Sequence, residues 1–179
     1  MKKLLLLGLV FISLYGCREQ EQDPTVLPPA TQEGKNTGGA LVNGEVWVAQ
    51  KVKSSHFVFK TYYEYPSPNT NGGEYRLKIV LARPEGSISH SLIRFFIKDT
   101  TDITTKTYIL NDLNGGGYST STDDDYATNS QNTGSITITK FDKDKQIVSG
   151  YFQFDGGNVN GNGEVIHITQ GRFDKKFIQ

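Results

Sequence analysis

The chain has 179 residues, and its 19 Lys and Arg are balanced by 19 Asp and Glu, so the formal net charge at pH 7 is zero. This balance leaves no basic stripe of the kind that binds nucleic acid or an anionic lipid surface. A single cysteine excludes a framework of disulfides within the chain.

The N-terminus has the pattern of a bacterial lipoprotein signal. Two lysines at residues 2–3 precede an apolar run over residues 4–12, which is shorter than the roughly 20 residues that a membrane-spanning helix needs. Residues 14–17 resemble the lipobox cut by type II signal peptidase, with a bulkier tyrosine at residue 15. We therefore expect residues 1–16 to be removed and Cys17 to carry the lipid that anchors the protein in the outer membrane.

Residues 17–38 are predicted to be the lipidated cysteine followed by a disordered tether. This segment is rich in acids, glutamine and proline, and only residues 26–27 interrupt it with apolar side chains. Such a composition buries too little apolar surface to offset the entropy of ordering the chain. Residues 18–23 resemble the surface-export signal of Bacteroidetes-type lipoproteins, which would place the protein on the cell surface; a generic solvated tether is the alternative.

Residues 39–179 are predicted to form one β domain. Residues 41–48 contain two apolar runs across Asn43-Gly44, the strongest short-range signal for a hairpin. Alternation of apolar and polar residues predicts further strands, and a helical period is nowhere sustained. The predicted strands are 75–82, 92–98, 106–110, 136–139, 148–154, 164–169 and 172–177, with a further candidate at 56–62.

The breaks between these strands are rich in turn-forming residues, at 66–73, 83–87, 99–105, 114–117 and 155–163. Many short antiparallel strands favour a single β-sandwich, with a closed β-barrel as the alternative. Gly150 is expected on an inward face where a facing ring or a bend needs space, and Gly171 at a bulge or tight corner before the last strand. The expected core is Trp47, Ile79, Leu81, Phe95, Ile136, Phe152, Phe154 and Ile168.

Three parts of the chain together resemble a known family. They are residues 36–47, residues 134–142 with 148–154, and residues 166–174. The pattern resembles a family of small Bacteroidetes-type lipoproteins described only as a domain of unknown function. The resemblance implies a compact β domain behind a lipid anchor. It implies no activity, so no catalytic residue is assigned from it.

Tyr62, Tyr63 and Tyr65 are the candidate ligand-binding residues. Three tyrosines in four positions cannot all face inward from one strand, so at least one ring is expected to be exposed. Exposed rings beside carboxylates and amides are typical of β domains that stack against sugars. The alternative is a core strand that ends at the turn starting with Pro66.

Two further sites are weaker candidates. Asp123, Asp124 and Asp125 offer oxygen ligands for calcium, although the spacing of an EF-hand loop is missing. Residues 99–101 resemble the three-residue O-glycosylation sequon of Bacteroidetes-type envelope proteins, which makes Thr100 the candidate modified residue. The three histidines have no metal-ligand spacing, and no cofactor is predicted.

These features predict a non-enzymatic binding module on the cell surface, with a glycan as the candidate ligand. The expected partners are the membrane, through the lipid on Cys17, and a glycan or an envelope protein, but no nucleic acid. A structural or accessory subunit of an envelope assembly is the alternative. A hydrolase is disfavoured because no catalytic motif such as a G-x-S-x-G elbow is present.

Overall fold

The computed structural model describes residues 22–52, 59–87, 89–120 and 125–179. These residues form eleven strands and one helical turn. The elements are, in chain order, β1 (Thr37–Val42), β2 (Glu45–Val48), β3 (Tyr62–Glu64), α2 (Pro68–Asn71), β4 (Tyr75–Pro84), β5 (His90–Asp99), β6 (Thr107–Leu110), β7 (Gly115–Ser119), β8 (Asp125–Ala127), β9 (Gly134–Asp142), β10 (Ile147–Asn158) and β11 (Val165–Lys176).

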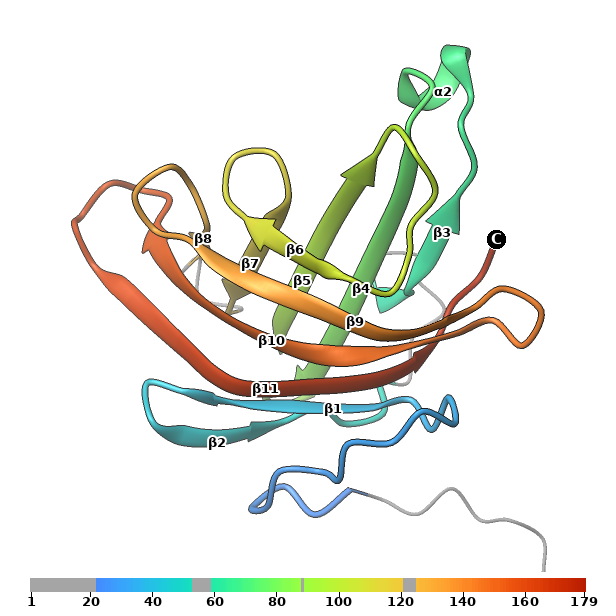
Figure 1. Cartoon of the computed structure of the whole chain (residues 1–179). Coiled ribbons are helices and arrows are strands. Elements are labelled where there is room, and N and C mark those ends of the chain that lie inside the picture. Colours follow the sequence, from blue (N-terminus) through green and yellow to red (C-terminus); the bar gives the residue numbers. More distant parts are fainter. Residues whose placement is uncertain (1–21, 53–58, 88, 121–124) are drawn as a thin grey trace, which may run out of the picture.

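All paired strands are antiparallel and belong to one sheet. Its order is β2-β1-β11-β10-β8-β7-β5-β4-β3, while β9 pairs with β10 and β6 pairs with β9. The sheet folds back on itself, so that β9, β10, β11 and β1 form one layer and β3, β4, β5 and β7 form the other (Figure 1). It does not close into a barrel. The predicted all-β fold is therefore confirmed, and its architecture is sandwich-like.

The core lies between the two layers and contains the side chains that alternate inward along each strand. Phe95 of β5 lies with its ring centroid 4.8 Å from that of Phe152 and 5.9 Å from that of Phe154, both on β10. These contacts join the layers across the core. All eight predicted core residues are buried in one cluster, namely Trp47, Ile79, Leu81, Phe95, Ile136, Phe152, Phe154 and Ile168.

The predicted hairpin and close-packed glycine are also confirmed. Asn43 and Gly44 have φ of 50° and 87°, the left-handed values that both central residues of a type I′ turn require, and they join β1 to β2. At Gly150 an added Cβ would lie 2.0 Å from the carbonyl oxygen of Thr137 on β9. The two strands approach so closely there that only glycine fits.

The predicted turn at residues 114–117 is wrong, because residues 115–117 belong to β7. Glycine lowers the strand propensity of this segment, but β7 pairs with β5 on one side and β8 on the other. A Cβ added at Gly116 would lie 3.1 Å from Leu110 and 3.4 Å from Phe154, so close packing favours a glycine here. The predicted strand at 56–62 lies partly outside the described residues, and β3 covers Tyr62–Glu64.

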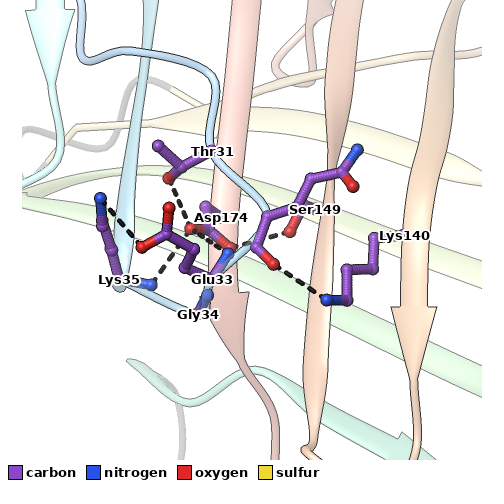
Figure 2. A network of polar contacts seen from close by, with 8 residues as sticks. Thr31, Glu33, Gly34, Lys35, Lys140, Ser149 and Asp174 are labelled. Atoms are coloured by element: carbon purple, nitrogen blue, oxygen red, sulfur yellow. Dashed lines mark hydrogen bonds and ion pairs between the residues drawn. The ribbon is translucent and has the colours of Figure 1, made fainter.

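The tether predicted to be disordered up to residue 38 is corrected at its C-terminal end. Residues 37–38 lie in β1, and residues 31–35, here called the strap, cross the outer face of β10 and β11 (Figure 2). Asp174 lies under the strap and is only 1% exposed. Its carboxylate accepts hydrogen bonds at 2.6–3.2 Å from the hydroxyls of Thr31 and Ser149 and from the backbone N–H groups of Glu33, Gly34 and Lys35.

No helix within the described residues has the length and hydrophobicity of a membrane span.

Candidate functional site

The outer face of β3, β4 and β5 carries the main candidate site. The register places Tyr62 of β3 opposite Lys78 of β4, Lys78 opposite Phe96 of β5, and Phe96 opposite Gly115 of β7. Four residues that are far apart in the sequence therefore form one row across four strands. Side chains opposite one another in an antiparallel pair are the closest neighbours on that face, so the row is a continuous surface.

Lys78 occupies the centre of this row. Its ammonium nitrogen lies 5.5 Å from the ring centroid of Tyr62 and 5.6 Å from that of Phe96, within the range of cation–π contacts. The residue is only 8% exposed, whereas Phe96 is 46% exposed. Burial, and then the nearby Arg94 charge, lower the pKa of Lys78 below its ordinary value. The row thus presents one ring with a largely open face beside a partly desolvated positive charge.

A second row lies next to the first. Glu64, Arg76 and Lys98 are opposite one another on β3, β4 and β5. Together the two rows line a shallow groove of about 590 Å³, which Tyr65 borders as well. Three of its charged residues are cations and one is a carboxylate, so the groove is positive although the whole chain is neutral.

The three predicted tyrosines lie in different environments. Tyr65 is 51% exposed and Tyr62 is half-buried, and both line the groove. Tyr63 points the other way and is buried in the core, so its ring is closed to a ligand. Alternation along β3 explains why Tyr62 and Tyr63 point to opposite faces. Tyr65 follows the end of β3, and its ring centroid lies 5.0 Å from that of Tyr63, but the ring stays exposed. The structure therefore leaves Tyr62 and Tyr65 as the two tyrosines with access to a ligand.

Tyr63 belongs to a polar cluster that ties the turn between β9 and β10 to the rest of the domain. Its hydroxyl donates a hydrogen bond of 2.6 Å to Asp102, which also forms an ion pair with Lys143 of that turn. The Lys143 ammonium lies 5.1, 5.5 and 5.9 Å from the ring centroids of Tyr63, Tyr65 and Tyr75.

The pKa values at this cluster move in opposite directions. Burial, and then the hydrogen bond to Asp102, raise the pKa of Tyr63. Burial also acts to raise the pKa of Asp102, but hydrogen bonds from Lys143 and Tyr63 outweigh it and the net shift is downward. Tyr63 therefore stays a neutral donor to an ionised carboxylate, which is a structural role.

The weaker candidates are placed as follows. Asp125 lies in β8, 3.5 Å from the guanidinium of Arg94, while Asp123, Asp124 and Cys17 lie outside the described residues. Thr100 is exposed directly after β5, consistent with the predicted loop, and its glycosylation stays a prediction. In the described part of the chain, no three His, Cys, Asp or Glu side chains are grouped so that they could hold a metal ion.

Sequence reasoning missed Lys78, Phe96, Arg76 and Lys98 as members of the site. Their signal was present, since Lys78 and Phe96 each lie between two buried residues of β4 or β5, and Arg76 and Lys98 each adjoin one. Alternation shows that such residues share a face of their own strand, but it does not show which residues of different strands are opposite one another.

Comparison with known proteins adds a family match without an activity. Residues 92–175 match the model of a family described as a domain of unknown function, DUF6252. No curated protein and no solved structure matches the chain. The matched segment runs from β5 to β11, so it includes Phe96 and Lys98, while the groove residues of β3 and β4 precede it.

Proposed function

We propose that this chain is a lipid-anchored envelope protein whose β domain binds saccharide chains on the outer face of β3, β4 and β5. The anchor rests on the N-terminal sequence pattern that ends at Cys17. The binding activity rests on one observation above all, the row of Tyr62, Lys78 and Phe96 across three neighbouring strands.

The row has the chemistry that a saccharide requires. The apolar C–H face of a sugar ring packs on an aromatic ring, and its hydroxyls accept hydrogen bonds from cationic donors. Tyr62 and Phe96 lie two strand spacings apart, roughly 9–10 Å. A chain of sugar units that crosses the strands therefore meets both rings and, between them, the ammonium group of Lys78.

The groove favours binding over hydrolysis. Glycosidic bond cleavage commonly uses two carboxyl groups that flank the scissile bond. Among the described residues that line the groove, Glu64 is the single carboxylate. The shallow, open shape also fits a ligand that lies along the surface rather than one enclosed for reaction.

Glycan-array binding by the full chain, purified in detergent, tests this proposal. We expect Tyr62→Leu and Phe96→Leu each to weaken retention about tenfold, which corresponds to about 1.4 kcal/mol of binding free energy. Tyr151→Leu is the matched control, because Tyr151 is 49% exposed on β10 in the other layer.

The control should bind as the unaltered protein does, and all three variants should keep its melting temperature within a few degrees. If no saccharide on the array retains the protein, or if all variants are retained equally, the groove is not a saccharide site.

A further inference from the structure

A second hollow continues the groove across β5. It has a volume of about 260 Å³ and is bordered by Arg94 and Phe96 of β5, by residues 115–117 of β7, and by Asp125 and Tyr126 of β8. Phe96 borders both hollows. The two hollows therefore adjoin on one face of the sheet, with the Phe96 ring between them.

The floor of the second hollow is partly bare backbone. Gly115 lies directly opposite Phe96, and a Cβ added there would meet no atom within 4 Å. Gly117 is likewise the register partner of Arg94 on β5. A ligand that leaves the ring of Phe96 can thus lie against the peptide groups of β7 without meeting a side chain from these two positions.

Cations are concentrated along this combined groove. Arg76 and Lys98 are directly opposite each other on β4 and β5, and Lys78 and Arg94 follow on the same face. Like charges in opposite positions of a sheet are destabilising. Lys98 forms no ion pair with any residue that the structure describes, whereas Arg76 and Arg94 form ion pairs of 3.5 Å with Glu74 and Asp125. With Glu64, three carboxylates accompany the four cations, so a net positive charge remains that would attract an anionic ligand.

We propose that the ligand is an acidic polysaccharide, with carboxylate or sulfate groups, that crosses β3, β4 and β5 and extends over β7 and β8. This inference rests on the saccharide-binding function proposed above and adds the charge and the extent of the ligand. The cations contact the acidic substituents, and the exposed rings contact the sugar faces. Single-stranded nucleic acid also carries a negative charge on every unit, so its binding is the competing outcome of the test.

Matched pairs of polymers test the charge. The full chain in detergent is titrated with polygalacturonate and its fully methyl-esterified form, and with dextran sulfate and dextran. In at least one pair the acidic polymer should bind tenfold or more tightly than its neutral partner, and added salt should weaken that binding. Single-stranded DNA serves as the competing polyanion and should bind more weakly than the acidic polymer.

Variants test whether these residues supply the charge. Lys98→Gln and the double variant Arg76→Gln/Lys98→Gln should lose affinity for the acidic polymer stepwise, and affinity for its neutral partner should change little. Arg172→Gln on β11 removes one positive charge from the other layer and should change neither. Tighter binding of DNA, or equal loss with Arg172→Gln, would overturn the proposal.

The extent of the ligand is tested by Gly115→Leu, which places a side chain in open space on the floor of the second hollow. We expect weaker binding of the polymer and an unchanged melting temperature. Unchanged binding would overturn the extension over β7.

Failure of this inference is distinguishable from failure of the proposed function. Equal binding of acidic and neutral polymers would remove the preference for acidic saccharides and leave saccharide binding intact. Binding of no saccharide on the array or in the titrations would remove both.

Discussion

The buried environment of Asp174 is the feature of a single residue that the sequence predicts least. It lies on the outer face of β11, where a solvated carboxylate is expected, yet the strap covers it and five donors converge on its two oxygens. Burial acts to raise its pKa, but the hydrogen bonds from Thr31, Ser149 and the strap backbone outweigh burial, and the pKa lies below its ordinary value. The ionised form is therefore the one that holds the strap.

Replacing Asp174 with asparagine should destabilise the fold by at least about 2 kcal/mol, because hydrogen bonds to a charged group are each worth about 1.5–3 kcal/mol. The lowered pKa of Asp174 also predicts how the stability of the fold changes with pH. The stabilisation is fully present above the unfolded-state pKa of about 4 and is lost as the pH falls through the lower folded-state pKa. Urea unfolding between pH 2 and 7 measures both effects.

Comparison of the Asp174→Asn variant with the unaltered protein isolates the effect of Asp174 titration on stability. The stability of the variant should fall less steeply below pH 4 than that of the unaltered protein, since the titrating group has been removed. Parallel pH profiles of the two proteins would show that Asp174 contributes no such linkage.

At the scale of elements, β10 shows how alternation divides one strand between two roles. Phe152 points into the core, while its neighbour Tyr151 is 49% exposed. Phe152→Ala should cost about 3–5 kcal/mol of unfolding free energy, since it removes buried ring contacts and leaves a cavity. Tyr151→Ala removes a ring of similar size from the outer face and should cost far less. Chemical denaturation of the two variants measures the difference, and equal costs would contradict the assigned faces.

Two glycines on neighbouring elements provide a second contrast. Gly150 of β10 has a carbonyl oxygen where a Cβ would lie, whereas Gly115 of β7 has open space. Gly150→Ala should therefore destabilise the domain strongly. Gly115→Ala should be neutral or stabilising by up to about 1 kcal/mol, because alanine lowers the entropy of the unfolded chain. Thermal unfolding of both variants tests this pair, and the reverse order would contradict the packing of β9 against β10.

At the scale of the whole molecule, the strap and the groove lie on different layers. The strap crosses β10 and β11, while the groove lies on β3, β4 and β5 (Figure 1). Under the proposed anchoring at Cys17, the strap ties the chain to the layer that does not carry the proposed binding face. This arrangement leaves the groove available to a ligand on the side away from the strap.

The anchor itself is tested by Cys17→Ser. Because the cysteine thiol is the acceptor of the lipid in the lipobox pattern, we expect the variant to remain uncut or to be recovered in the soluble fraction. Fractionation of cells, with mass spectrometry of the mature N-terminus, measures both outcomes. Normal processing and membrane association of the variant would show that the lipobox is not used.

The sequence by itself determined most of the strands, the faces of those strands and eight residues of the core. Alternation is a local property, so the inward side chains Trp47, Phe95 and Phe152 could be recognised without knowing which strands pair. The hairpin at Asn43-Gly44 was predictable for the same reason, since positive φ at both positions restricts the residues locally. The strand β7 was missed because its glycines resemble a turn until the flanking strands are present.

Only the tertiary structure decided which faces meet and what covers them. The row of Tyr62, Lys78 and Phe96 depends on the register between three strands, and a shift of one residue would send each side chain to the other face. The strap depends on contacts between residues 31–35 and Asp174, which are separated by about 140 positions in the chain. Hydrogen bonds and packing between such distant segments follow from the whole fold, and for that reason neither the groove nor the end of the tether could be predicted from local sequence.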